Sequence, residues 1–450
     1  MLKGAEQETT TARDDGAITS ITVCGYKSIG EERSIDVRPL TILAGANSSG
    51  KSSIMQPLLL MKQTLEASYD PGALLLNGPN VRFTSAEQLL SRPGKCTRAD
   101  LLYMGIETRP DSLTTYFRKE PSKGFDIERM EFKSARETTI LRIGMTHDEI
   151  VAVLPRDLKK LSDAIAERGK AKSEWVVGRN RCFLELGLRL GDEKESHVLW
   201  GGIPPGGSSE ACMRGLVHLP GLRGNPERTY PVTAVGSTFP GTFEKYVASV
   251  IAQWQADKED GKLEEISRHL AKLGLTWKVI AKPVNDTQVE LQVGRLTHAA
   301  RGGARDLVNI ADVGFGVSQT LPVIVALLAA QPGQLVYLEQ PEIHLHPRAQ
   351  AALAWVLAEA ANRGVRVVAE THSSLLLLET QSLVAEEVIP GEKVILHWFK
   401  RRDSDGITEV TSATLDEAGA YGDWPEDFAE VSLEAQGRYL DAAGSRLRRG

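Results

Sequence analysis

Apolar residues along the chain form short runs whose spacing predicts alternating strands and helices. Near the N-terminus, residues 18–24 (ITSITVC) and 35–44 (IDVRPLTILA) are typical of strands, and the end of the second, LTILA, is apolar on both faces. A strand that is apolar on both faces belongs at the centre of a covered sheet. The following segment, 54–67 (IMQPLLLMKQTLEA), predicts a helix that Pro57 should kink or start later.

The last third of the chain has the clearest pattern. Apolar strands are predicted at 334–339 and 365–371, and they alternate with helices predicted at 315–330, 347–364 and 372–386. This order of elements predicts a parallel sheet with right-handed crossovers.

The middle of the chain, from residue 77 to 296, has a weaker pattern. Its segments indicate antiparallel strands at 101–119, 129–145 and 175–190, helices at 157–171 and twice within 241–274, a flexible loop at 201–210, and a hairpin over 275–296 that turns at Asn285 and Asp286.

Composition indicates a soluble protein of two or three domains. The chain has 450 residues, of which 42% are hydrophobic and 25% are charged. No apolar run approaches the roughly 18 residues that cross a bilayer, so we expect no membrane partner. The four cysteines form no CxxC pair and residues 1–17 form a polar tail without a signal-peptide core, so we expect a cytoplasmic protein. The net charge of −6 disfavours binding of nucleic acid over the whole surface, but it does not exclude binding in a local basic groove.

Residues 45–52, GANSSGKS, fit the phosphate-loop pattern G-x-x-x-x-G-K-[ST] between a predicted strand and a predicted helix. Such a loop wraps backbone N–H groups around phosphates, its lysine reaches the β- and γ-phosphates, and its last hydroxyl binds Mg²⁺. A chance match in a glycine-rich turn is the alternative, and the flanking elements argue against it. The candidate phosphate-binding residues are Gly45, Ala46, Asn47, Ser48, Ser49, Gly50, Lys51, Ser52 and Ser53, and the motif alone admits ATP or GTP.

Two polar segments follow apolar strands further along the chain. Glu339 ends the strand at 334–339, where it would bind Mg²⁺ together with Ser52, or would only cap the turn beside Pro341. His372 follows the next strand in the sequence ETHSS, where it would contact the γ-phosphate, or would only be a capped loop histidine. Both loops should leave the same edge of the sheet and meet at the same phosphate.

The order of these motifs resembles the ATP-binding-cassette heads of the SMC and RecF type. The phosphate loop is followed by a long insertion, then VGFGVSQ, the acidic strand with EQPEIHLHP, and ETHS. Together with DWPEDF at 423–428, these motifs are most similar to the bacterial OLD-like ATPases of the AAA-type group. The resemblance covers 18–90 and 305–430 well and the middle loosely. It implies an α/β fold: an ABC-ATPase-like P-loop head with a mixed or parallel sheet, an inserted α+β region and a short C-terminal cap.

The resemblance also implies a division of the chain and a partner copy. The expected parts are a disordered tail (1–17), an N-terminal lobe of the head (18–90), an inserted region (91–304), a C-terminal lobe of the head (305–400) and a cap with a tail (401–450). Gly314, Gly316 and Gln319 would form the signature region, which contacts ATP bound to the other subunit of a head-to-tail homodimer or higher even oligomer. Arg223 and Arg228 would face a partner or ligand, or would lie in a solvated loop. No Toprim nuclease domain follows the head, so a separately encoded effector is expected.

Gln340 stands where similar ATPases carry a glutamate that activates water. An amide orients water but accepts a proton poorly, so slow ATP hydrolysis is predicted. Glu342 or Glu370 would otherwise supply a carboxylate, which makes Glu339, Gln340, Glu342 and His372 the candidate catalytic residues.

Three functions fit the sequence. The first is an ATP- and Mg²⁺-dependent switch that controls an effector, plausibly in phage defence. The second is a DNA-binding maintenance or repair ATPase of RecF type. The third is a nucleotide-dependent scaffold with little turnover, which Gln340 would favour.

Overall fold

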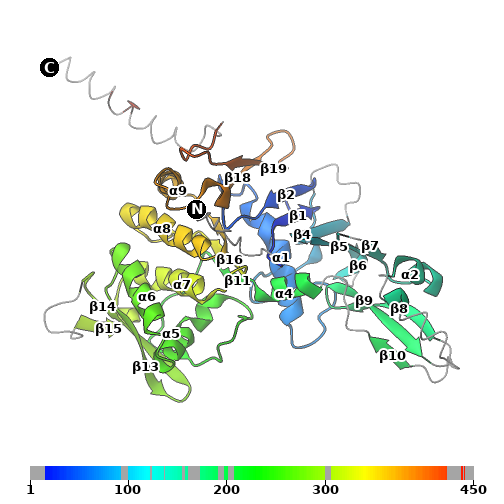
Figure 1. Cartoon of the computed structure of the whole chain (residues 1–450), viewed down its shortest axis with the longest axis horizontal. Helices are drawn as coiled ribbons and strands as arrows, with labels where there is room; N and C mark the ends of the chain where they lie inside the picture. Colours follow the sequence, from blue (N-terminus) through cyan, green and yellow to red (C-terminus); the bar gives the residue numbers. More distant parts are fainter. Residues whose placement is uncertain are drawn as a thin grey trace, which may run out of the picture.

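A computed structural model shows a central mixed sheet with an antiparallel sheet on one side and a smaller mixed layer of helices and strands on the other (Figure 1). The structure describes residues 16–92, 100–121, 124–135, 137–154, 158–160, 173–190, 197–200, 207–298, 306–422, 437–438 and 440.

The central sheet has six strands, of which five are parallel. Their order is β11 (Val217–Leu219), β16 (Leu335–Glu339), β17 (Arg366–Glu370), β3 (Leu40–Gly45), β18 (Val394–Arg401) and β19 (Thr408–Thr414). Only β19, at one edge, runs antiparallel to its neighbour. The expected α/β class, with the phosphate-loop strand in a mixed and mainly parallel sheet, is confirmed.

The side chains of the central strands alternate between two apolar cores. On β3, Leu40, Ile42 and Ala44 face one core, whereas Leu43 faces the other together with Tyr337 of β16. The first core is closed by α7 (Phe315–Ala329), α8 (Pro347–Asn362) and α9 (Ser374–Ala385), and the second by α1 (Lys51–Glu66). Burial on both faces explains why β3, β16 and β17 are apolar at most of their positions.

The second core also packs against strands from the N-terminal half of the chain. The antiparallel sheet has the order β2 (Arg33–Asp36), β1 (Ser20–Cys24), β4 (Leu101–Thr108), β5 (Asp111–Glu120), β6 (Gly124–Lys133) and β7 (Thr138–Leu141). Beside it lie β10 (His197–Trp200), β9 (Phe183–Leu190), β8 (Ser173–Asn180), α2 (His147–Val153), α4 (Gly207–Gly215) and η1 (Ala86–Gln88).

The opposite side of the molecule holds a smaller sheet and two helices (Figure 1). Its elements are β12 (Tyr230–Pro231), β14 (Gln288–Gly294), β13 (Val279–Asn285), β15 (Leu307–Asn309), α5 (Val247–Ala256), α6 (Asp260–Lys272), η2 (Phe243–Tyr246) and η4 (Ile310–Asp312). Elsewhere, the short helix η5 (Gly391–Lys393) precedes β18 of the central sheet. The two helices and the hairpin that the sequence predicts for 241–296 are therefore confirmed.

Several predicted elements are wrong in extent. The strand expected at 35–44 is two strands in different sheets, because the chain turns between Asp36 and Leu40. The stretch 101–119 holds parts of two antiparallel strands, β4 and β5, instead of one. The stretches 129–145 and 175–190 are divided in the same way, into β6 and β7 and into β8 and β9. Helix α4 replaces the last part of the loop expected at 201–210, and α1 begins at Lys51 and runs through Pro57. Most of the helix expected at 157–171 and the DWPEDF segment lie outside the described residues.

Candidate nucleotide-binding site

The phosphate loop connects the buried strand β3 to helix α1, as the motif predicts. Gly45 has φ of 144° and Gly50 has φ of 107°, a region that side chains with a Cβ rarely adopt. A Cβ at Gly45 would lie 2.2 Å from the Phe399 carbonyl oxygen, and one at Gly50 would lie 2.4 Å from Thr408 Oγ1. The two glycines therefore allow the loop to curl tightly against β18 and β19, which leaves backbone N–H groups available for phosphate oxygens.

Lys51 lies folded over the loop. Its Nζ donates hydrogen bonds to the carbonyl oxygens of Gly45 and Ala46, both at 2.9 Å. Burial lowers the pKa of Lys51, and the nearby carboxylates of Glu370 and Glu342 oppose this effect. Among the described residues, the hydrogen-bond partners of this buried cation are two loop carbonyls, so a phosphate group fits as its counter-charge.

Ser52 contacts a carboxylate on strand β17. Its hydroxyl donates to Glu370 Oε2 at 2.9 Å, and the Tyr337 hydroxyl donates to Glu370 Oε1. Burial and the neighbouring Glu339 raise the pKa of Glu370 to about 7, although the two hydroxyls and Lys51 oppose this. The acid nearest to the phosphate-loop hydroxyl is thus Glu370, and not the Glu339 that the sequence predicts.

Glu339 lies opposite Glu370 in the parallel pair β16–β17, but its carboxylate points to other groups. Its Oε1 is 3.2 Å from His218 Nε2, and its Oε2 accepts a hydrogen bond from the Gly221 N–H at 3.1 Å. Burial alone would raise the pKa of Glu339, but the hydrogen bonds from His218 and Gly221 and the charge of Arg223 outweigh it and lower the pKa.

Gln340 follows β16 and lies beside the phosphate loop. Its φ is 43°, an uncommon value for a residue with a side chain, and its N–H donates to the Glu370 carbonyl oxygen at 2.9 Å. Backbone strain of this kind is often found at functional sites. The structure therefore places an amide at the position where the sequence predicts control of a water molecule.

Glu342 and His372 are joined through the loop after β17. Glu342 Oε1 accepts hydrogen bonds from Thr371 Oγ1 at 2.7 Å and from the His372 N–H at 2.9 Å. Burial and the charge of Lys51 lower the pKa of His372, and a hydrogen bond with the Gly45 backbone opposes them. In this arrangement Glu342 holds the histidine loop.

A hollow of about 320 Å³ brings the predicted phosphate-loop residues from Asn47 to Ser53 together with Gln340 and His372. It is lined by Lys27, Asn47, Ser48, Ser49, Gly50, Lys51, Ser52, Ser53, Gln56, Gln340, Glu370, His372 and Arg401. The predicted residues Gly45, Ala46, Glu339, Glu342, Gly314, Gly316 and Gln319 do not line it. Parallel pairing of β3, β17 and β16 explains the gathering, because their carboxyl ends meet at one edge of the sheet.

Sequence reasoning did not identify Lys27 and Arg401 at the rim of this hollow. Lys27 Nζ donates to Gln56 Oε1 at 2.6 Å and lies 4.7 Å from the centre of the Phe83 ring. Arg401 Nε donates to the Ser48 carbonyl oxygen at 2.8 Å. Lys27 lies in the connection GYKSIGEE and Arg401 at a strand end, and neither position carries a local signal of ligand binding.

The signature region lies apart from this hollow. Gly314 caps α7, and Gln319 is buried one turn further on, where its Nε2 donates to the Gly224 carbonyl oxygen at 2.8 Å. Gln319 instead lines a larger cleft of about 710 Å³ together with Arg223 and Tyr230.

The two arginines near this cleft differ from each other. Arg223 is buried, and its guanidinium donates to the carbonyl oxygens of Gln319 at 3.0 Å and Glu339 at 2.9 Å. Burial lowers the pKa of Arg223 to about 10. Arg228 is exposed and pairs with Asp312 at 2.8 Å. The solvated loop that the sequence also allowed is wrong for Arg223, because this buried side chain joins the signature helix to the acidic strand. That Arg223 faces a partner or ligand stays a prediction.

The oxygen atoms beside the phosphate loop suit Mg²⁺. This cation is usually held by one or two carboxylates, substrate phosphates and water, and not by an all-protein cage. The pairing of the Ser52 hydroxyl with the Glu370 carboxylate matches that pattern. Among the described residues, no group of three or more His, Cys, Asp or Glu side chains could hold a metal by itself.

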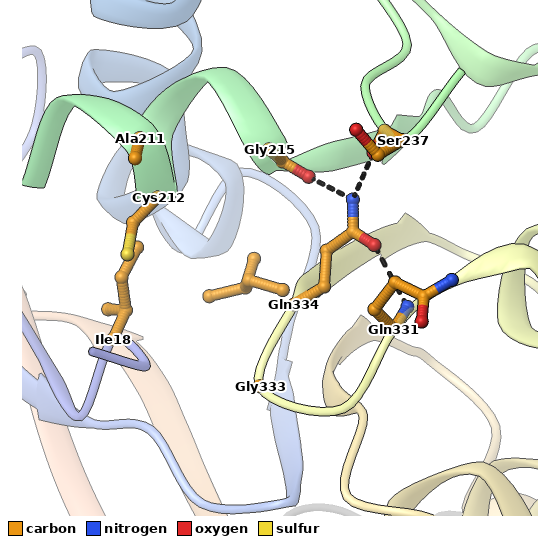
Figure 2. A pocket seen from close by; sticks show the side chains of 9 residues that line it. Ile18, Ala211, Cys212, Gly215, Ser237, Gln331, Gly333 and Gln334 are labelled. Carbon is orange, nitrogen blue, oxygen red and sulfur yellow. Dashed lines mark hydrogen bonds between the residues drawn. The ribbon is translucent and has the colours of Figure 1, made fainter. Parts of the chain in front are cut away.

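Another hollow, of about 280 Å³, lies where α4 approaches the turn before β16 (Figure 2). Gln334 spans one side of it, since its Nε2 donates to the carbonyl oxygens of Gly215 and Ser237 and its Oε1 accepts from the Gln331 N–H. Its lining includes Ile18 and Cys212 and none of the predicted site residues, so it is separate from the candidate nucleotide site.

Two family models match separate parts of the chain. Residues 17–181 match a model described as "AAA ATPase domain", and residues 247–379 match one described as "AAA domain, putative AbiEii toxin, Type IV TA system". The first match contains the phosphate loop, and the second contains the acidic strand and the histidine. Both models describe AAA domains, and each match covers less than half of the chain, so the matches support an ATP-binding AAA ATPase domain.

Several solved structures of SMC heads match most of the chain at low sequence identity. The SMC head bound to the C-winged helix domain of ScpA is 15% identical, with 89% of this chain and 99% of that chain covered and a TM-score of 0.46. The SMC head from Thermotoga maritima is 11% identical, with 88% and 98% covered and a TM-score of 0.35. The head from Pyrococcus yayanosii, with a coiled coil and joint, is 11% identical, with 93% and 99% covered and a TM-score of 0.46.

No curated protein matches the chain. Among the helices of the described residues, none is both long enough and apolar enough to cross a bilayer.

Proposed function

We propose that this protein is a cytoplasmic ATP-dependent switch that binds ATP with Mg²⁺ and hydrolyses it slowly. The observation that carries this proposal is the position of Gln340, which lines the phosphate-loop hollow where a proton acceptor for water would be expected. Lys51 and His372 line the same hollow, so the site has groups for binding and sensing the γ-phosphate.

In the proposed reaction, the loop N–H groups and Lys51 hold the β- and γ-phosphates. Lys51 would exchange its two loop carbonyl partners for phosphate oxygens. Mg²⁺, held by Ser52 and a strand-end carboxylate, supplies charge neutralisation on the phosphates. Gln340 orients the attacking water, and His372 contacts the γ-phosphate and responds to its loss.

Slow turnover follows from the chemistry of the amide. Gln340 can donate and accept hydrogen bonds, but it is not a useful proton acceptor. General-base catalysis contributes about 10²–10⁴-fold to typical rates. The ATP-bound state would therefore persist, which suits a switch better than a motor.

The proposed switch closes as a homodimer or higher even oligomer around ATP. Gly314, Gly316 and Gln319 do not line the hollow that holds Lys51, which supports their acting on nucleotide bound to another copy. Each hollow would then be completed by the signature region of the partner subunit.

The proposed output is control of a separately encoded effector, plausibly in phage defence. The resemblance to OLD-like ATPases supports this, as does the toxin–antitoxin system named in the description of one matching family model. In this proposal ATP binding and hydrolysis set how long the effector is restrained or released.

The first test compares ATP turnover and molar mass for the wild type and Gln340→Glu, with Lys51→Ala as the blank. We expect slow turnover by the wild type, turnover at least about tenfold faster for Gln340→Glu, and a mass by light scattering that rises with ATP. Brisk wild-type turnover unchanged by Gln340→Glu would contradict the role of Gln340. A mass that is the same with and without ATP would contradict the switch.

A nucleotide-dependent scaffold is the second candidate, and the amide side chain of Gln340 favours it because an amide is a poor proton acceptor. In a scaffold, ATP would still raise the molar mass, but neither the wild type nor Gln340→Glu would turn ATP over above the Lys51→Ala blank.

A further inference from the structure

We propose that Glu370, rather than Glu339, is the carboxylate that completes the magnesium site beside Ser52. This assignment rests on the proposed function, because it concerns the complex of ATP and Mg²⁺ described above.

The order of strands brings Glu370 closer to the phosphate loop. Strand β17 lies directly between β3 and β16, so its last residue is one strand away from the loop and Glu339 is two strands away. The hydrogen bond of 2.9 Å between Ser52 Oγ and Glu370 Oε2 shows that the carboxylate already reaches the hydroxyl that would bind the cation. Glu370 lines the hollow and Glu339 does not.

Glu339 is held on the far side of β16. His218 and the Gly221 N–H each contact one of its oxygens, and the other ring nitrogen of His218 lies 3.0 Å from Asn80 Oδ1. The His218 ring also stacks on Tyr337 at 5.4 Å between centroids. Glu339 would have to break contacts with β11 and the segment after it before it could reach Ser52.

Tyr337 fixes the orientation of Glu370. Its hydroxyl occupies Oε1, which leaves Oε2 directed at Ser52 and the phosphate loop. Among the described residues, neither oxygen of Glu370 takes part in a salt bridge, although the side chain is buried. A buried carboxylate without a contacting cation is costly, and Mg²⁺ at Oε2 would offset that cost.

The test measures how much Mg²⁺ tightens the binding of a fluorescent ATP, N-methylanthraniloyl-ATP, to the full chain. Affinity is measured in Mg²⁺ and in EDTA for the wild type, Glu370→Gln, Glu339→Gln and Glu359→Gln. The Glu359 variant is the matched control, because this partly buried acid lies on α8 and does not line the hollow.

We expect Glu370→Gln to lose about tenfold or more of the tightening by Mg²⁺, with little change of affinity in EDTA. Glu339→Gln and Glu359→Gln should keep the tightening. Loss of the tightening in Glu339→Gln, or its retention in Glu370→Gln, would overturn the assignment.

Thermal unfolding shows whether each variant is folded. If Glu370→Gln fails to fold, Glu370→Asp, which keeps the charge but shortens its reach, should show a reduced tightening, and full retention would overturn the assignment. A wild type that binds the nucleotide no better than Lys51→Ala would overturn the proposed function itself, an outcome distinct from failure of the Glu370 assignment alone.

Discussion

At the scale of single residues, Arg223 links two elements beside the phosphate loop, helix α7 and strand β16. The Arg223 guanidinium donates hydrogen bonds to the carbonyl oxygens of Gln319 on the signature helix and of Glu339 and Gln340 at the end of the acidic strand. The planar guanidinium can donate to several carbonyl oxygens at once in a fixed geometry, and a lysine ammonium cannot reproduce that geometry. Any movement of α7 relative to β16 must therefore stretch or break these hydrogen bonds.

Removal of the Arg223 guanidinium should lower the stability of the folded protein. We expect Arg223→Met to lower the free energy of unfolding by about 2–4 kcal/mol, because buried carbonyls lose a charged donor. Urea unfolding followed by circular dichroism measures the change. The control is Arg228→Met, which should cost at most about 1 kcal/mol because its ion pair with Asp312 is exposed. Equal losses for the two variants would contradict the structural role of Arg223.

The identity of the binding residues could be predicted only in part. Lys51, Ser52 and His372 follow from motifs whose local spacing implies their chemistry. Glu370 was harder to assign, because two apolar strands both end in glutamate and sequence alone does not give their order in the sheet. The structure resolves this through the register, in which Glu339 pairs with Glu370 and β17 adjoins β3. The sequence singled out Arg223 but not its contacts, because its partners are backbone atoms distant in sequence.

At the scale of elements, His397 on β18 links the two large sheets. Its Nε2–H donates to the Asp36 carbonyl oxygen at the end of β2, at 2.8 Å, and its Nδ1 lies 2.7 Å from Ser412 Oγ of β19. Since a carbonyl can only accept, the neutral tautomer with a proton on Nε2 fits both contacts. Burial lowers the pKa of His397, although the Asp36 contacts oppose it.

This lowered pKa predicts a dependence of stability on pH. Below the ordinary imidazole pKa of about 6.5, the unfolded chain takes up a proton that folded His397 does not, so stability falls as the pH falls. We expect His397→Gln to have a shallower loss of stability between about pH 6.5 and 5, measured by thermal unfolding. The exposed His298→Gln should follow the wild-type pH profile, and an unchanged profile for His397→Gln would refute the prediction.

Helices and strands could be predicted where the spacing of apolar residues within a segment is typical of a single element. The three helices and two strands predicted between residues 315 and 386 were correctly identified, because each is uniformly apolar or amphipathic. The stretch 35–44 was predicted as one strand because the alternating apolar and polar residues of its first half run directly into the apolar LTILA. Only tertiary pairing divides it, with β2 beside β1 and β3 beside β17.

At the scale of the whole molecule, Gly314 offers a test of the proposed pairing of subunits. A Cβ at this position would meet no atom within 4 Å, so a side chain fits the isolated chain. Aspartate is also a favourable residue at the start of a helix. We therefore expect Gly314→Asp to retain thermal stability but to prevent closure on ATP, because its carboxylate would face the γ-phosphate bound to the partner.

Mixing two inactive proteins makes this test decisive. Lys51→Ala lacks the phosphate lysine and Gly314→Asp lacks a usable signature, so a mixed dimer would contain one intact composite site. We expect ATP turnover to appear on mixing, although each protein alone is inactive. A mixture that remains inactive would contradict a site shared between two copies, and full activity of Gly314→Asp alone would do the same.

The central sheet also has a consequence for how the protein is made. Strand β3 is flanked by β17 and β18, and Arg366 donates a hydrogen bond to the Val37 carbonyl oxygen, 329 residues earlier. At ordinary rates of synthesis, a ribosome needs roughly tens of seconds to make the intervening chain. During that time the nascent protein carries a complete phosphate-loop sequence without the strands that hold it. Nucleotide loading must therefore wait until β17 and β18 have been synthesised and have paired with β3.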